Sequence, residues 1–252
     1  MSSTNQTAVE LLEPLLEKSP SLVLTAEQTA GRGRKGNSWW SSGGALTFSV
    51  VMNAASLGLP EDRRPLMSIV TGVAVRSALA QFCGNQTVLM KWPNDVYVGN
   101  RKICGILAEQ HLVGSRFGSE DSRRDNADIQ KTGLILGIGV NVNNSLQGAP
   151  AEVRQRAVSL FDLEHQVFDL NQILVTILIK LQELIEQASS QPRRFLADAN
   201  FHHLLNGKSV LVQTGDSLIA GKCVGIDDTG NLVLQSETEI HRICSGIVQR
   251  WS

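Results

Sequence analysis

Apolar side chains recur at three- and four-residue steps in several segments, which is the spacing of one face of a helix. The predicted helices span 64–82, 169–188 and 192–205, with a shorter one starting near Asn5. Asp169 or Asn171 is placed to cap the second of the long helices. The third carries a proline in its first turn, where the ring is tolerated.

Short runs rich in β-branched residues, bounded by glycine, proline and polar residues, predict strands. Ahead of residue 206 these are 21–26, 45–52, 88–92, 95–98, 102–110 and 132–142. Residues 111–131 mix charge, glycine and serine with little apolar periodicity, which predicts an exposed, mobile loop. Together these elements predict an α/β (α+β) domain, with a mixed central sheet flanked by helices.

The pattern changes near Gly207, after which only short alternating runs follow. These predict five strands, at 210–213, 218–226, 232–235, 239–244 and 247–250. A meander of short strands is typical of a small barrel of the SH3 type. We therefore expect two domains, 1–205 and 206–252.

Composition narrows the class of protein. The chain has 252 residues, of which 42% are hydrophobic and 19% charged, so it is neither disordered nor fibrous. With a net charge of −1, a global electrostatic grip on DNA or an anionic membrane is not expected. The four cysteines and five histidines show no zinc-ligand spacing, and the N-terminus lacks the regions of a signal peptide. A cytoplasmic protein that does not bind membranes is the expectation.

The densest chemical signal runs from Gln28 to Trp39 and contains the series Gly31-Arg32-Gly33-Arg34. Closely spaced glycines present backbone N–H groups to an anion, and arginines pair with phosphate or carboxylate. A solvated basic loop is the plain alternative. An RGG-type nucleic-acid tail is another, although such tails repeat and lie in disordered ends.

Three further clusters are weak when each is taken alone. Lys91-Trp92-Pro93-Asn94-Asp95 is either a ligand-facing strand end or an ordinary proline turn. Lys102 heads an apolar strand, so it is either a functional cation or a residue snorkelling at an edge. In Gly137-Ile138-Gly139-Val140-Asn141, the glycines suit close approach to a ligand, but no dinucleotide fingerprint is present.

Taken in order, these clusters resemble the biotin protein ligase family from residue 2 to near the C-terminus. The segments that carry the resemblance are Ser3-Thr4-Asn5, Gln28-x-x-Gly31-Arg32-Gly33-Arg34-x-Gly36-x-x-Trp39, Lys91-Trp92-Pro93-Asn94-Asp95, Lys102-x-x-Gly105-Ile106-Leu107-x-Glu109 and Gly137-Ile138-Gly139-x-Asn141-x-Asn143. The resemblance implies a catalytic domain like that of class II synthetases. It also implies formation of biotinyl-5′-AMP from biotin and ATP, followed by transfer of biotin to a lysine of the biotin carboxyl carrier protein of acetyl-CoA carboxylase.

By this resemblance the site residues fall into three groups. The biotin-binding residues are Ser3, Thr4, Asn5, Gln28, Arg32, Gly33, Arg34 and Lys102. The residues on the ATP and adenylate side are Arg32, Arg34, Trp39, Asn94, Asn141 and Arg250. Arg34, Lys102 and Asp95 are the expected catalytic residues, with Asp95 acting on the incoming carrier lysine. Mg²⁺ is expected to accompany ATP, but no protein ligand for it is evident.

The resemblance also implies limits. Some family members carry an N-terminal DNA-binding domain, and a chain whose Ser-Thr-Asn segment starts at residue 3 is expected to lack operator binding. A homodimer formed through the central sheet is a further expectation. Two rivals stay open: a lipoate–protein ligase or octanoyl transferase, and a non-catalytic regulator that responds to biotinyl-AMP.

Overall fold

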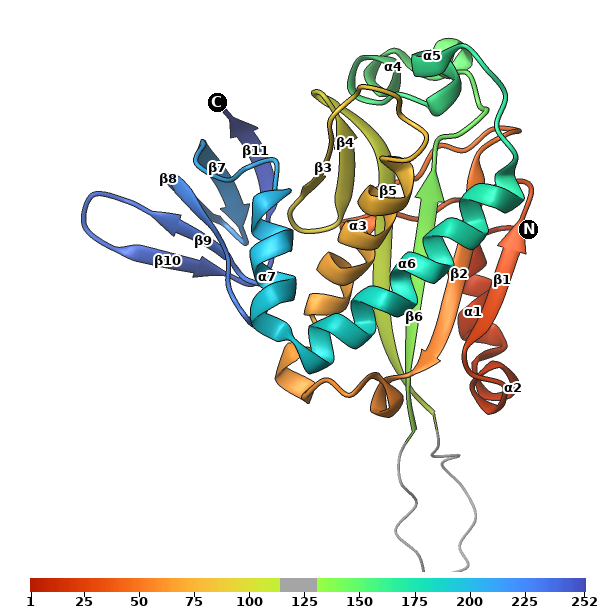
Figure 1. Cartoon of the computed structure of the whole chain (residues 1–252), viewed down its shortest axis with the longest axis horizontal. Coiled ribbons are helices and arrows are strands. Elements are labelled where there is room, and N and C mark those ends of the chain that lie inside the picture. The colour runs from red at the N-terminus through yellow and green to blue at the C-terminus, as the bar shows by residue number, and fades with distance from the viewer. Residues whose placement is uncertain (114–130) are drawn as a thin grey trace, which may run out of the picture.

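The protein folds into a large and a small β-sheet with helices around the large one, as a computed structural model shows for residues 1–113 and 131–252 (Figure 1). The helices are α1 (Thr4–Glu10), α2 (Leu12–Glu17), α3 (Leu66–Leu79), α4 (Ala151–Arg156), α5 (Leu160–Glu164), α6 (Leu170–Ser190) and α7 (Pro192–Phe201). The strands are β1 (Ser21–Thr25), β2 (Leu46–Asn53), β3 (Val88–Lys91), β4 (Asp95–Val98), β5 (Arg101–Val113), β6 (Lys131–Val140), β7 (Ser209–Thr214), β8 (Ser217–Ile226), β9 (Leu232–Gln235), β10 (Ile240–Ile243) and β11 (Ile247–Trp251).

The large sheet has the strand order β1-β2-β6-β5-β4-β3. Each of its five strand pairings is antiparallel. The expected α/β class is confirmed, but the expectation of a mixed sheet is wrong for these strands. Parallel pairing occurs only as isolated bridges, such as Met90 with His203, among the residues described. Short turns connect β3 to β4 and β4 to β5, and such turns favour antiparallel neighbours.

The two faces of this sheet carry different layers, because successive side chains of a strand point to opposite sides. One face packs on α3 and α6, and Phe48, Val50 and Met52 of β2 lie in that core. On the other face, Val51 belongs to a smaller core with residues of α1 and α2. Polar Ser49 lies on this second face too, close to the N-terminus of α1.

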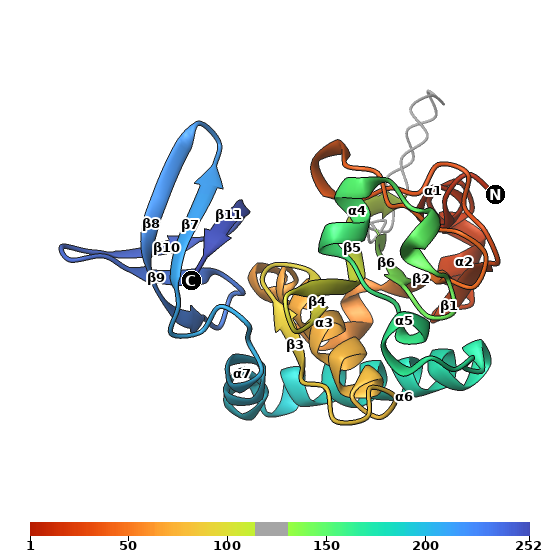
Figure 2. The same cartoon turned by 90° about the horizontal axis from the view of Figure 1, so that it is seen from above.

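The small sheet has the order β10-β9-β8-β7-β11, with all pairings antiparallel, so the expected C-terminal β domain is present. In both ribbon views it lies beside α7 (Figures 1 and 2). Its buried side chains, Val212 and Leu234 among them, join the same hydrophobic cluster as the α3–α6 face of the large sheet. The two sheets are therefore packed together through apolar contacts.

Most predicted elements are confirmed, and Asp169 caps α6 by accepting a hydrogen bond from the Asn171 N–H at 2.8 Å. The predicted loop over 111–131 is wrong at its ends, because β5 continues to Val113 and β6 starts at Lys131. The rest of that prediction lies outside the described residues. Helices α4 and α5 have only 6 and 5 residues, too few for a periodic pattern to reveal them.

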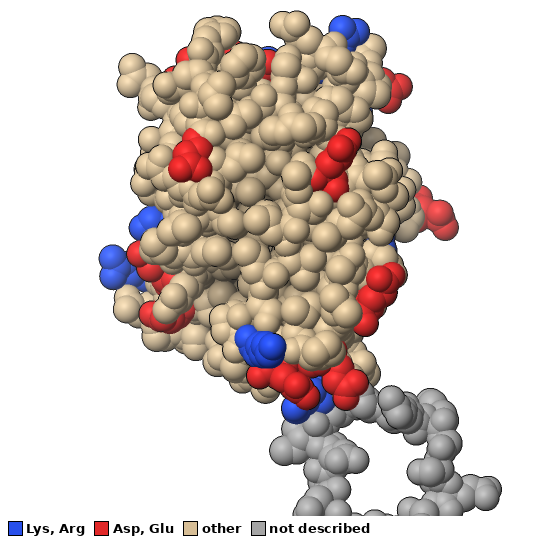
Figure 3. Space-filling model, turned by 90° about the vertical axis from the view of Figure 1, so that its right-hand side faces the viewer, with Lys and Arg blue, Asp and Glu red and all other residues tan. Residues whose placement is uncertain are grey.

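The face that carries β1, α1 and α2 is largely uncharged at its centre, with single acidic and basic side chains scattered over it (Figure 3). Leu22 and Leu24 of β1 are among the exposed apolar residues there. Across the described part of the chain, none of the helices combines the length and the apolar character needed to cross a bilayer.

Candidate active site

A cavity of about 200 Å³ opens where distant segments of the chain meet. Its walls come from the start of α1, the loop 32–39, the β3–β4 turn, the middle of β5 and β6, and Gly246–Val248 of the small sheet. It is lined by most of the residues expected at the site: Ser3, Thr4, Asn5, Gln28, Arg32, Gly33, Arg34, Trp39, Asn94, Asp95 and Lys102. Segments far apart in sequence thus converge on one concave surface, as small-molecule sites usually require.

The side chains that line one end of the cavity, here called the uncharged end, are polar and neutral, and one of them bonds to the carboxylate of Glu109. The backbone N–H of Thr4 donates to Gln28 Oε1 at 2.8 Å. The Ser49 hydroxyl lies 2.7 Å from Thr4 Oγ1 and 2.6 Å from Asn5 Oδ1. Asn5 Nδ2 in turn donates to Glu109 Oε2 at 2.8 Å. These groups are mostly buried and form one connected network, which fixes the direction of each donor and acceptor.

Glycines in β5 and β6 make room for this network and for Trp39. A Cβ at Gly137 would overlap the Asn5 carboxamide. A Cβ at Gly139 would come within 2.6 Å of the Trp39 ring, and one at Gly105 within 3.0 Å of it. Larger residues here would fill the cavity or force side chains aside, which accounts for the glycine-thinned strand seen in the sequence.

The loop 31–39 brings two arginines to the cavity. Arg32 pairs with Glu109 at 3.3 Å and is about half exposed. Arg34 lies deeper and donates to Asn94 Oδ1 at 3.4 Å. Burial lowers the pKa of Arg34, and the negative charge of Asp95 opposes that effect. A guanidinium that has already lost much of its water interacts strongly with an anion in the cavity.

The opposite end of the cavity is dominated by an ion pair. Lys102 Nζ lies 2.5 Å from Asp95 Oδ1, and both side chains are largely shielded, at 29% and 16% exposed. Asp95 Oδ1 is buried and has no well-aligned hydrogen-bond donor among the described residues, so the contact is ionic. Lys102 also sits 5.6 Å from the centre of the Trp39 ring. A cation, a carboxylate and a ring therefore meet at this end.

Sequence reasoning gave no site role to three residues that build the site, although Lys91 and Glu109 belonged to the quoted motifs. Ser49 links Thr4 to Asn5, and the available signal was that Ser49 is one of two hydroxyl residues, with Thr47, in the predicted strand 45–52. Glu109 holds both Asn5 and Arg32. Lys91 lines the cavity while its ammonium lies 4.5 Å from the Trp251 ring and 5.3 Å from that of Tyr97. Burial lowers the pKa of Lys91, Asp95 acts to raise it, and Lys102 lowers it further.

Two of the expected residues are not among the described residues that line the cavity. Asn141 is buried and accepts a hydrogen bond from Asn144 Nδ2 at 3.0 Å. Arg250 is exposed on β11, opposite Leu211 of β7. Among the described residues there is also no group of three His, Cys, Asp or Glu side chains that could hold a metal ion.

Comparison with known proteins places this geometry in a family. Residues 1–118 match the Biotin/lipoate A/B protein ligase family, and residues 206–251 match the Biotin protein ligase C terminal domain. The chain is 33% identical to the biotin--[acetyl-CoA-carboxylase] ligase of Mycobacterium tuberculosis, over 84% of this chain and 73% of that protein. The chain belongs to the biotin protein ligase family. It is therefore a ligase.

Other members of the family align with a larger share of this ligase than the Mycobacterium tuberculosis protein does. The bifunctional ligase/repressor BirA of Bacillus subtilis is 29% identical over 99% of this chain and 71% of its own length. The structure of the Aquifex aeolicus biotin protein ligase in complex with biotin and ATP is 27% identical. It superimposes with a TM-score of 0.76 over 100% of this chain and 96% of that chain. Sequence and fold thus agree on the assignment across both sheets.

Proposed function

We propose that this ligase activates biotin with ATP to biotinyl-5′-AMP and pyrophosphate, and then transfers biotin to a lysine of a biotin carboxyl carrier protein of acetyl-CoA carboxylase. One observation carries the proposal. A single cavity joins an end lined by neutral, hydrogen-bonded side chains to a cationic end. Two relatives are named biotin--[acetyl-CoA-carboxylase] ligase, and a related structure holds biotin and ATP, which supports the proposal.

The uncharged end suits the ureido ring of biotin. That ring is neutral and carries two N–H donors and a carbonyl acceptor, so it needs matched partners rather than charge. Thr4, Asn5 and Gln28 offer such partners, and Ser49 holds two of them in place. In this arrangement the valeryl chain runs across the glycines of β5 and β6, and the carboxylate reaches the cationic end.

The cationic end suits the first chemical step. A biotin carboxylate oxygen attacks the α-phosphorus of ATP, a new P–O bond forms, and pyrophosphate leaves. Two anions must approach each other, so fixed positive charge lowers the barrier most where they meet. We assign that task to Arg34 and Lys102, with Arg32 and Gly33 closing over the reactants. Trp39 and Asn94 are assigned to the adenylate side, and the proposal does not depend on Asn141 or Arg250.

The second step is attack of the carrier lysine on the acyl carbon, with AMP as leaving group. The attacking amine must be neutral, and Asp95 is assigned to orient it and to accept its proton during attack. Burial raises the pKa of the Cys83 thiol to about 12 and also raises that of Cys104. These buried thiols stay protonated, which agrees with direct transfer from the adenylate.

Mg²⁺ is assigned to the phosphates of ATP. It would be held mainly by the nucleotide and water, and would neutralise the charge of the leaving pyrophosphate. We assign no described side chain to it. We further propose that the two domains are 1–205 and 206–252.

Biotin-dependent exchange of labelled pyrophosphate into ATP tests the proposed function directly. We expect exchange that requires biotin and that is not supported by lipoate. Exchange driven equally well by lipoate would reassign the chain to the lipoate branch. Tight binding of biotinyl-5′-AMP without any exchange would make it a non-catalytic regulator.

A further inference from the structure

Trp92 lies in the β3–β4 turn, and two contacts from the last fifty or so residues hold it. Its backbone N–H donates to His203 Nε2 at 3.2 Å, and its indole Nε1–H donates to the carbonyl oxygen of Gly230 at 3.0 Å. Only 1% of the residue is exposed. A large side chain that is anchored at both its backbone and its indole has little freedom to move.

The His203 anchor has a defined protonation state. Because Trp92 supplies the proton, Nε2 must be the acceptor, so the ring hydrogen resides on Nδ1. Burial and the nearby charge of Lys91 lower the pKa of His203 to about 3. The imidazole is therefore neutral at ordinary pH and keeps its lone pair for Trp92.

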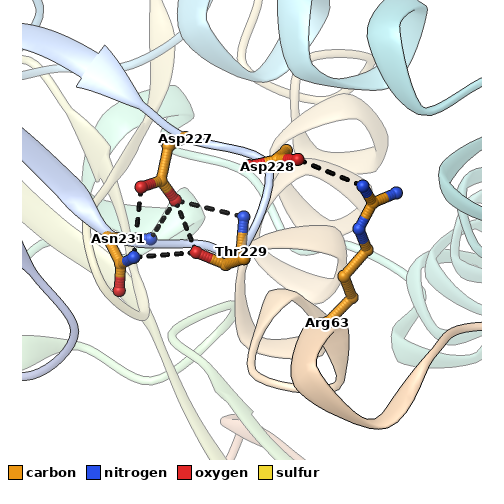
Figure 4. Close-up of polar contacts among 5 residues, drawn as sticks. All are labelled: Arg63, Asp227, Asp228, Thr229 and Asn231. Carbon is orange, nitrogen blue, oxygen red and sulfur yellow. Dashed lines mark hydrogen bonds and ion pairs between the residues drawn. The ribbon is translucent and has the colours of Figure 1, made fainter.

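The Gly230 anchor is set by a tightly bonded turn in the small sheet. Asp227 Oδ1 accepts from Thr229 N at 3.1 Å, from Thr229 Oγ1 at 2.9 Å and from Asn231 N at 2.9 Å, and Oδ2 accepts from Asn231 Nδ2 at 3.1 Å (Figure 4). Burial acts to raise the pKa of Asp227, but these hydrogen bonds outweigh it and the pKa is lowered. One carboxylate thus fixes the residues on both sides of Gly230.

Trp92 is followed in the chain by the residues that hold the cationic end of the cavity. Two residues further along, Asn94 bonds to the Ile106 carbonyl at 2.6 Å and accepts from Arg34. The next residue, Asp95, pairs with Lys102. A shift of Trp92 would therefore displace the partners of both Arg34 and Lys102, whereas Thr4 and Gln28 belong to other segments.

We propose that the Asp227–Asn231 turn is a positioning element for the active site, acting through Gly230 and Trp92 on Asn94 and Asp95. This inference rests on the roles assigned above to Arg34, Lys102 and Asp95. Asp227 is not among the residues that line the cavity, and its effect is to hold the cationic end in position relative to the uncharged end. The C-terminal domain then contributes to rate through a turn that does not line this cavity, although Thr229, Gly230 and Asn231 line a second one together with Arg34 and Trp92.

The turn supplies its own matched control. Asp228 is the neighbour of Asp227, but its carboxylate points to Arg63 at 3.1 Å and is 60% exposed (Figure 4). An exposed ion pair of this kind contributes little to stability or order. Asp227→Ala removes four side-chain hydrogen bonds of the turn and a 3.7 Å ion pair with Arg242. Asp227→Asn retains the oxygen that accepts three of those hydrogen bonds, and Asp228→Ala removes only the ion pair with Arg63.

The experiment measures kcat and the biotin KM for pyrophosphate exchange in these variants, after circular dichroism has confirmed that each is folded. A displaced reacting group costs about 10- to 100-fold in rate, so we expect a fall of that size in kcat for Asp227→Ala, with KM within about twofold. Asp227→Asn should restore most of the rate, and Asp228→Ala should match the wild type. Wild-type kcat in folded Asp227→Ala, or equal losses in Asp227→Ala and Asp228→Ala, would overturn the inference.

A second variant decides the matter if Asp227→Ala fails to fold. Trp92→Phe removes the indole N–H and keeps most of the buried ring, so it should lower kcat in the same range and leave the biotin KM unchanged. Wild-type kcat in Trp92→Phe would overturn the inference even if Asp227→Ala cannot be studied. Failure of the proposed function reads differently, because wild-type protein would then show no biotin-dependent exchange at all.

Discussion

The two ends of the cavity are built in opposite ways. The uncharged end is made of short neutral hydrogen bonds among Thr4, Gln28, Ser49 and Asn5, on elements next to the start of the chain. The cationic end consists of charged groups held by longer or purely ionic contacts, as for Arg34 and Lys102. Fixed neutral partners give selectivity for one ligand. Cations that are not held by several hydrogen bonds can form new contacts with the reacting anions. Binding and rate should therefore be separable by mutation.

The largest separation is expected from Lys102→Ala. Removing this cation leaves the developing charge at phosphorus without one of its partners, so adenylate formation should slow by at least about 10²-fold, with little change in biotin affinity. Arg34→Ala should behave in the same way. Pyrophosphate release in single-turnover experiments is the measurement, and exposed Arg101, changed to alanine, is the adjacent control. Wild-type pyrophosphate release from Lys102→Ala would remove it from the mechanism.

Asp95→Ala tests whether the same end also serves transfer. Starting from preformed biotinyl-5′-AMP, loss of a positioning carboxylate and proton acceptor should slow biotinylation of the carrier by up to about 10²-fold. Labelled biotin on the carrier lysine gives the rate. If transfer proceeds unchanged, the role assigned to Asp95 in this step is wrong.

Gly137→Ala addresses the opposite end. The added methyl group would overlap the Asn5 carboxamide, so the biotin KM should rise by about tenfold or more while kcat changes less. Gly148→Ala is the matched control, since its Cβ would meet open space. A fall in kcat at unchanged KM would show that the two ends are not separable as described.

The smallest expected effect is a change in how the stability of the protein depends on pH, and it comes from His203. His203 has a folded pKa of about 3 against an ordinary value of 6.5, so the unfolded chain binds a proton that the folded chain refuses. Its contribution is complete above about pH 6.5 and is lost as the pH falls from there toward 3, by about 1.4 kcal/mol per pH unit.

Urea unfolding measures this contribution. Between pH 7 and pH 5 it amounts to about 2 kcal/mol, and His203→Gln should make the loss of stability on acidification smaller by that amount. Exposed His165, changed to asparagine, should leave the pH dependence as it is. An identical pH dependence in wild type and His203→Gln would contradict the buried, neutral imidazole.

Sequence reasoning reached most of the fold because the signals were local. Runs rich in β-branched residues predicted the strands before residue 206, and short alternating runs predicted those after it. The long amphipathic pattern predicted α6 together with its cap at Asp169. Strand direction was not accessible in that way. A single strand reads the same whichever way its neighbour runs, and so the expectation of a mixed sheet was wrong.

The site was predictable where chemistry is unusual for its local setting, as in the arginines between two strands or the lysine at the head of an apolar strand. It was not predictable where a residue acts on something distant. Ser49 lies more than forty positions from its two partners, and Trp92 lies more than a hundred from each of its anchors. Only the folded chain shows such pairs, because long-range contacts leave no periodic trace in one sequence.

The contact of Lys91 with Trp251 limits how domains can be exchanged between members of this family. A lysine that lines the cavity rests on a ring from the last strand of the small sheet, and the buried side chains of the two sheets belong to one cluster. Grafting the C-terminal domain of a relative onto this catalytic domain would bring a foreign ring and foreign turn to Lys91 and Trp92. An active hybrid would need the residues on both sides of this contact between the domains to come from the same protein.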